Sequence, residues 1–199
     1  RRYAGADMAS LAETRRVDNT IVFADLVSFT QRSNELTPEE VMETARSVFE
    51  LSSEVLKRHA TQPLSYLGDG LLAHATGQEH GRRGVAFACD FTARCHNVTR
   101  IRQALWGDEP LPLRHQMNVR CGVATGPVVL GTLGSLAKLE FAAIGMTTNR
   151  AARLQGQAEP NQVVTDAAID GPWTERGVAE SYRLKGIDGD VNAVRIQVV

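Results

Sequence analysis

The sequence predicts an α+β fold, with a ferredoxin-like βαββαβ core, a C-terminal extension and a mainly antiparallel sheet that is covered by helices on one face. Short runs of β-branched and aromatic residues alternate with two long amphipathic stretches, as in layered strands and helices. A Gly-Asp-Gly centre between two apolar arms indicates a β-hairpin. No repeat or low-complexity linker interrupts the 199 residues, so we expect one globular domain.

The first strand is expected in residues 19–30 (NTIVFADLVSFT), where a β-branched and aromatic run ends at Asp25 and a turn follows. A helix begins after Thr37, a suitable N-cap, because Pro38 occupies the first helical position and a glutamate the third. Apolar residues recur at three- and four-residue spacing behind it, so one face of this helix should pack on the sheet as far as about His59.

The hairpin is expected in residues 64–75 (LSYLGDGLLAHA), with Asp69 at its tip. A second amphipathic helix should follow in about residues 84–105. These elements complete the order strand, helix, hairpin, helix, which is the first part of the expected βαββαβ core.

The C-terminal half is predicted to add strands around one short helix. Residues 117–134 (MNVRCGVATGPVVLGTLG) predict a strand pair, and residues 147–157 (TTNRAARLQGQ) a short helix that ends near Gly156. Residues 162–169 and 181–199 should supply late strands and a final hairpin. Three glycines are expected to bend the strand pair: Gly122, Gly126 and Gly131.

Charge and composition exclude several classes of function. A net charge of −1 without clusters of Lys and Arg predicts no nucleic-acid partner. No apolar run is long enough to cross a bilayer and no signal sequence is present, so we expect no membrane partner and a cytoplasmic location. The five histidines lack the spacing of zinc ligands. The chain starts at Arg1, which leaves room for an upstream regulatory domain. The three cysteines are expected to pack in the core: Cys89, Cys95 and Cys121.

Two aspartates are expected to meet where neighbouring strands end. Asp25 ends a buried strand and Asp69 tips the hairpin, and two carboxylates this close repel each other unless a cation holds them. Oxygen ligands favour Mg²⁺ or Mn²⁺ together with substrate phosphates. For a single aspartate in a turn a structural role is the commoner explanation. The segment 26–30 (LVSFT) favours a functional role, because a tight turn into a helix exposes N–H groups that cradle phosphate.

Five segments together identify a family resemblance. FADLVSFT, LGDGLLA, VRCGVATGPVVLGTLG, IGMTTNRAARL and LKG follow the order and approximate spacing of the class III nucleotide cyclase catalytic domain. The resemblance spans about residues 18–198, so we expect residues 1–17 to be an N-terminal arm and residues 18–199 the catalytic domain. It implies conversion of a nucleoside triphosphate into a 3′,5′-cyclic monophosphate and pyrophosphate.

The resemblance also implies roles for particular residues. Asp25 and Asp69 would hold two Mg²⁺ or Mn²⁺ ions, with the Leu26 carbonyl as a further ligand. Asn149 would orient the ribose, and Arg153 would stabilise charge on the α-phosphate, which suits the planar and permanently charged guanidinium. The triphosphate would be bound by a larger set: Ser28, Phe29, Thr30, Arg120 and Lys185.

In the family the active site lies between two subunits, with the aspartates from one and the Asn, Arg and Lys from the other. This chain carries both sets. The resemblance therefore implies a head-to-tail homodimer with two equivalent composite sites.

The base-selecting positions depart from the family pattern. Adenine-selective members have a lysine where this chain has Ser65 and an Asp or Thr where it has Ala142, and guanine-selective members usually have a glutamate at the first position. Tyr66 could add bulk beside the base or point into the core, because alternate strand residues face opposite sides. The altered pair resembles bacterial pyrimidine cyclases of anti-phage signalling, which make cyclic UMP or CMP. Two alternatives stay open: an adenylate cyclase with an irregular base pocket, and a non-catalytic nucleotide-binding or dimerising domain.

Overall fold

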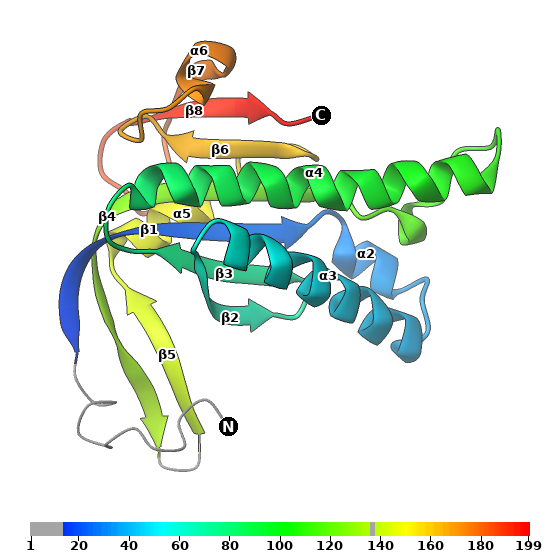
Figure 1. Ribbon diagram of the computed structural model, residues 1–199, viewed down its shortest axis with the longest axis horizontal. Helices are drawn as coiled ribbons and strands as arrows, with labels where there is room; N and C mark the ends of the chain where they lie inside the picture. The colour runs from blue at the N-terminus through cyan, green and yellow to red at the C-terminus, as the bar shows by residue number, and fades with distance from the viewer. Residues whose placement is uncertain (1–13, 136–137) are drawn as a thin grey trace.

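A computed structural model describes residues 14–135 and 138–199 as one sheet with helices on both faces (Figure 1). The sheet has eight strands in the order β2-β3-β1-β4-β6-β8-β7, and β5 pairs with β4 outside this path. The strands are β1 (Arg15–Leu26), β2 (Gln62–Leu67), β3 (Gly70–Ala75), β4 (Val119–Ser135), β5 (Lys138–Ile144), β6 (Gln162–Asp166), β7 (Val178–Tyr182) and β8 (Val191–Gln197). The helices are α2 (Phe29–Ser33), α3 (Pro38–Arg58), α4 (His80–Trp106), α5 (Met146–Gln155) and α6 (Trp173–Arg176), with the 3-10 turn η1 (Leu113–His115).

All neighbouring strands are antiparallel except β4 and β6, so the predicted α+β class is confirmed. The placement of the helices differs from the expectation of one covered face. The helices α3 and α4 cover one face, and α5 lies on the other (Figure 1). The reason is that the sheet has a hydrophobic core on each face. In β1 the adjacent residues Ile21 and Val22 are both fully buried, because each packs in a different one of these two cores.

The N-terminal half follows the predicted elements closely. A capping box starts α3: the Thr37 side chain accepts from the Glu40 N–H, and the Glu40 carboxylate accepts from the Thr37 N–H at 2.8 Å. Gly68, at a φ of 68°, makes the β2–β3 turn with Asp69. The second helix begins at His80, four residues before the predicted start.

The predicted strand pair in residues 117–134 is wrong, because this segment is one long strand. The first part of β4 pairs with β1 and its last part with β5, which the sequence pattern did not reveal. Its glycines mark close approaches rather than a turn. A Cβ at Gly122 would lie 2.1 Å from the Gln155 nitrogen of α5, and one at Gly131 would lie 2.6 Å from the Thr14 Cγ2.

The expected N-terminal arm, residues 1–17, lies only partly within the described residues. Residues 1–13 lie outside the described residues, whereas Arg15–Val17 already belong to β1 and pair with the middle of β4. None of the helices described is long and apolar enough to cross a membrane. The cysteines carry free thiols, and burial raises the pKa of Cys89 and of Cys121 to about 12.

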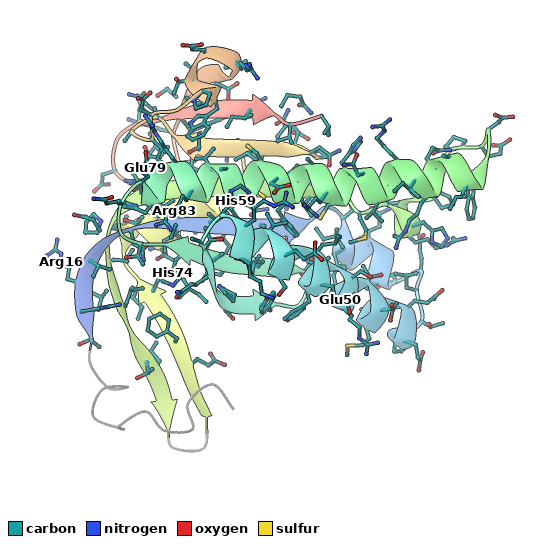
Figure 2. All side chains as sticks on the ribbon, in the orientation of Figure 1. Arg16, Glu50, His59, His74, Glu79 and Arg83 are labelled. Carbon is teal, nitrogen blue, oxygen red and sulfur yellow. The ribbon has the colours of Figure 1, made fainter. Side chains whose placement is uncertain are left out.

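A polar pair is buried on the face that α5 covers. The Asn19 amide nitrogen lies 2.9 Å from His74 Nδ1, and it donates to that nitrogen (His74 is labelled in Figure 2). His74 is only 3% exposed, and its burial, with a smaller effect of the nearby Arg15 charge, lowers its pKa to about 4. The imidazole is therefore neutral at physiological pH.

Candidate active site

The two predicted acidic ligands meet at one corner of the sheet. Asp25 is the penultimate residue of β1, between Gly70 of β3 and Arg120 of β4. The Leu26 N–H donates to the Asp69 carbonyl at 3.3 Å, which holds the hairpin turn against the end of β1. The sheet register therefore brings together residues that are far apart in the sequence.

The electrostatics of this corner favour a cation. The pKa of Asp69 is raised, first by burial and then by the charge of Asp25 and a contact between the two carboxyl groups. Within residues 14–135 and 138–199 no three His, Cys, Asp or Glu side chains gather as a metal cluster. Two carboxylates with a main-chain carbonyl still fit Mg²⁺ or Mn²⁺, which commonly take one or two carboxylates and complete their shell with water and phosphate oxygens.

Asp25 is held by two donors that reach the same carboxylate oxygen. Arg120 Nη2 lies 3.1 Å and Gln155 Nε2 3.3 Å from Asp25 Oδ2. The Arg120 Nε is buried and has no hydrogen-bond partner among the described residues. Gln155 was not predicted from the sequence. The helical period could have indicated it, because a residue two positions after Arg153 lies roughly on the opposite side of α5 and hence toward the sheet.

The predicted phosphate cradle follows directly after β1. Ser28 has a φ of 58°, an uncommon conformation for a residue with a side chain, and it turns the chain into α2. Phe29 starts this helix and packs against the core under α3 and α4. Thr30 is described only by its backbone in α2. The first N–H groups of a helix have no acceptor within the helix, so the backbone of this turn could bind phosphate.

The residues expected to act on the ribose and phosphates lie on outer surfaces. Asn149 and Arg153 are exposed on α5, whereas Ala151 and Leu154 on the other side of the helix are buried. Lys185 is exposed between β7 and β8. Among the described residues, no side-chain hydrogen bond or ion pair engages any of these three. A single copy of the chain does not bring them into contact with Asp25.

Ser65, at the first base-selecting position, and its neighbour Tyr66 face opposite sides of β2. Tyr66 pairs with the buried Leu71, and its ring stacks on Phe49 of α3 with the centroids 3.4 Å apart. It therefore packs toward the helix layer, one of the two orientations left open by the sequence. Ser65 pairs with Leu72 on the other face, which is also the face of Asp25.

Ser65 and Tyr66 both line a hollow of about 700 Å³ at the edge of the sheet, which also reaches Phe141 of β5. Ala142 follows Phe141 and pairs with Gly131 of β4. Since β2 and β5 are in contact, the two base-selecting positions belong to neighbouring elements.

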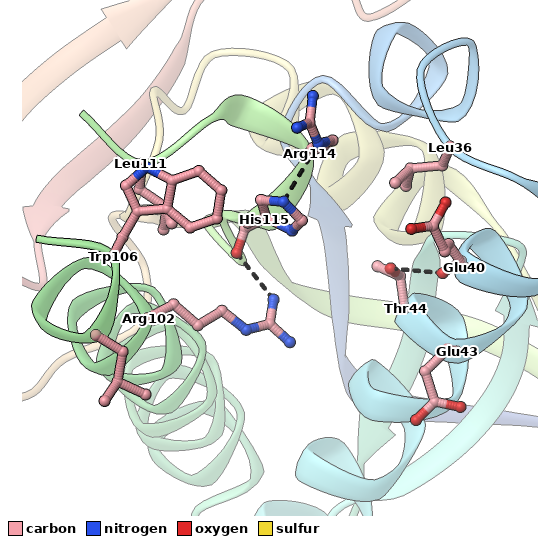
Figure 3. Close-up of a pocket in the computed structure, with 10 residues that line it drawn as sticks. Leu36, Glu40, Glu43, Thr44, Arg102, Trp106, Leu111, Arg114 and His115 are labelled. Carbon is pink, nitrogen blue, oxygen red and sulfur yellow. Dashed lines mark hydrogen bonds between the residues drawn. The ribbon is translucent and has the colours of Figure 1, made fainter. Parts of the chain in front are cut away.

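A second hollow, of about 380 Å³, lies between α3, the end of α4 and η1 (Figure 3). Its wall includes Trp106 and His115, whose ring centroids are 5.2 Å apart, and Arg102, which donates to the His115 carbonyl at 2.8 Å. None of the predicted site residues lines it.

Comparison with known proteins points to one family. The family model described as the adenylate and guanylate cyclase catalytic domain matches residues 12–171. The receptor-type guanylate cyclase gcy-4 of Caenorhabditis elegans is 29% identical over 149 residues, which are 72% of this chain and 12% of that protein. Adenylate cyclase 1 of Rhizobium meliloti (strain 1021) is 29% identical over 141 residues, 71% of this chain and 21% of that protein. The chain thus spans only a small part of these relatives.

Solved structures share the fold over most of the chain. The guanylyl cyclase Cya2 superposes with a TM-score of 0.77 at 23% identity and covers 91% of this chain and 92% of its own. The adenylyl cyclase CyaB from P. aeruginosa gives a TM-score of 0.78 at 19% identity, with 92% and 95% covered. Both guanylate and adenylate cyclases occur among these matches, so the similarity does not indicate the base.

Proposed function

The chain belongs to the adenylate and guanylate cyclase catalytic domain family, and from this premise we propose that it converts a nucleoside triphosphate into a 3′,5′-cyclic monophosphate and pyrophosphate. The observation that carries the proposal is the meeting of Asp25, near the end of β1, with Asp69 of the β2–β3 turn, where burial and the charge of Asp25 raise the pKa of Asp69. A pair of carboxylates of this kind can bind the metal ions of a metal-bound triphosphate.

We assign Asp25, Asp69 and the Leu26 carbonyl to two divalent cations, Mg²⁺ or Mn²⁺. When bound, these ions favour ionisation of the ribose 3′-hydroxyl and neutralise the phosphates as pyrophosphate leaves. Arg120 contributes a permanent positive charge beside this position, and its partly exposed guanidinium suits a phosphate oxygen. The backbone turn at Ser28 would cradle the remaining phosphate oxygens.

The second half of each site is proposed to come from another copy of the chain. Arg153 would stabilise charge on the α-phosphate, Asn149 would bind the ribose, and Lys185 would bind the triphosphate. Their exposure, and the absence of side-chain partners for them within residues 14–135 and 138–199, support this division. Exposed apolar side chains on the β4–β5 hairpin and at the start of α5 support a protein interface there: Val129, Leu133, Ile144 and Met146.

We further propose a pyrimidine substrate, so that UTP would give cyclic UMP or CTP cyclic CMP, in anti-phage signalling. Ser65 and Ala142 offer a hydroxyl and a methyl group where purine selection would use charged or strongly polar groups, and the loss of such groups removes selectivity for a purine edge. Tyr66 is engaged by Phe49, so we assign it to the packing of β2 against α3 rather than to contact with the base.

An adenylate cyclase with an irregular base pocket is the second candidate, and the similarity to adenylate cyclase 1 of Rhizobium meliloti favours it. A non-catalytic role as a nucleotide-binding or dimerising domain is the third. It would be expected of a chain that had lost an acidic ligand or the arginine of α5, and this chain retains Asp25, Asp69, Asn149 and Arg153.

The three candidates are separated by one assay. The purified protein is incubated separately with ATP, GTP, CTP and UTP in the presence of Mn²⁺, and the products are identified by mass. Cyclic UMP or cyclic CMP is expected. Equal or faster turnover of ATP would select the adenylate cyclase, and no product from any triphosphate would select the non-catalytic role.

Variants test the metal assignment and the dimer together. Asp69→Ala should abolish turnover while light scattering still shows a dimer. Asp108→Ala, which removes an exposed carboxylate from the loop after α4, should change neither. Retained turnover in Asp69→Ala would contradict the metal assignment, and a monomeric wild-type protein that is fully active would contradict the composite site.

A further inference from the structure

Gln155 is the last residue of α5 and makes a contact that the proposed mechanism does not use. Its amide Nε2 donates to Asp25 Oδ2 at 3.3 Å, and Arg120 Nη2 donates to the same oxygen at 3.1 Å. Among the described residues, these are the two side-chain N–H groups that donate to the Asp25 carboxylate, and both reach the same oxygen. The carboxyl group of Asp69 also contacts Asp25. Two donors on one oxygen fix the rotation of the carboxylate.

The position of Gln155 is fixed by backbone packing rather than by its side chain alone. Gly122 lies two residues after Arg120 on the same face of β4, and a Cβ there would lie 2.1 Å from the Gln155 nitrogen and 2.2 Å from the Ala151 oxygen. The end of α5 therefore rests directly on the strand that carries Arg120. This contact fixes the backbone position from which the Gln155 side chain reaches Asp25.

The two donors differ in charge. Arg120 is a cation whose side chain is partly exposed, so it can be shared between Asp25 and an anionic substrate. The Gln155 amide is neutral and orients a carboxylate without neutralising it. A carboxylate that binds a divalent cation needs this kind of support, because hydrogen bonds from outside the ligand set orient the ligands.

We propose that Gln155 is a positioning residue that holds the Asp25 carboxylate ready for a divalent cation, an inference that rests on the metal role of Asp25 in the proposed function. Gln155 does not touch the substrate. It keeps Asp25 in place while Arg120 turns to the phosphates. Loss of such a supporting hydrogen bond is expected to weaken metal binding about 10-fold.

The test measures binding of Mn²⁺ alone, by the loss of the free-ion electron paramagnetic resonance signal, to the purified wild-type protein and its variants. Gln155→Met removes the donor and keeps the length of the side chain, and Gln155→Ala removes the donor together with most of the side chain. Both should bind Mn²⁺ about 10-fold more weakly. In turnover assays the Mn²⁺ concentration at half-maximal rate should rise similarly, while kcat at saturating Mn²⁺ changes less than about twofold.

The matched control is Gln157→Met, at an exposed position two residues beyond, which should bind Mn²⁺ like the wild type. Thermal unfolding of all variants separates positioning from folding. Mn²⁺ affinity in Gln155→Met within twofold of the wild type would overturn the proposal, and so would a loss shared equally by Gln157→Met. Because no nucleotide is present, the result stands even if the wild-type protein forms no cyclic product.

Discussion

Replacing Gly122 with alanine should separate α5 from the sheet. The new methyl carbon would lie 2.1 Å from the Gln155 nitrogen and 2.2 Å from the Ala151 carbonyl oxygen, both of them backbone atoms that no rotamer change can move. Real Cβ contacts are essentially never shorter than 3.0 Å, so strand and helix must move apart by about 1 Å. Overpacking of this kind is expected to lower the free energy of unfolding by about 3 kcal/mol.

For a chain of this size that loss corresponds to a fall in Tm of about 6–12 °C, which differential scanning calorimetry or urea denaturation can measure. The shift should also carry the Gln155 amide away from Asp25, so Mn²⁺ binding should weaken as well. Gly156→Ala is the matched control. Gly156 has a φ of −66° and its nearest neighbour lies at 3.4 Å, so an alanine there should be neutral or slightly stabilising.

A Gly122→Ala protein that lost less than about 1 kcal/mol would refute this reasoning, because it would mean that α5 does not rest on β4 as described. Loss of stability with unchanged Mn²⁺ affinity would separate the two parts of the argument. It would leave the close packing in place and remove the link from that packing to Asp25.

Further predictions concern pH and base selection. Burial lowers the pKa of His74 to about 4, whereas the unfolded side chain takes up a proton near 6.5, so stability should fall by about 2 kcal/mol between pH 7 and pH 5, and urea titrations of His74→Gln should lack this part of the fall. Because the pKa of Asp69 is raised in the folded state, its stabilising protonation is lost as pH rises through that pKa; the rise in Tm on adding Mn²⁺ should therefore grow as pH rises and be absent in Asp69→Asn. Ser65→Lys combined with Ala142→Asp should raise kcat/KM for ATP relative to UTP, whereas Tyr66→Phe should leave that ratio unchanged.

The sequence predicted the elements whose signals are local. The Thr37 cap with its proline and glutamate marks the start of α3 correctly, and the glycines around Asp69 mark the β2–β3 turn. These signals depend only on nearby backbone geometry. The alternation of strands and helices was sufficient for the fold class.

Features that depend on tertiary packing could not be predicted in the same way. Gly122 and Gly131 looked like bends, but they allow α5 and Thr14 to approach one continuous strand. The placement of α5 on the second face depends on which side of β1 it covers. Gln155 was overlooked because its importance comes from Asp25, a residue 130 positions away in sequence.

The two sides of α5 have a consequence for the assembly proposed here. Its outward residues, Asn149 and Arg153, would serve one catalytic centre, while its last residue contacts the acidic ligand of the other. A tilt of this helix when substrate binds at the first centre would therefore move the contact with the acidic ligand at the second. The pair of centres would then behave as a mechanically linked unit, and amino-acid changes along this helix would alter both at once.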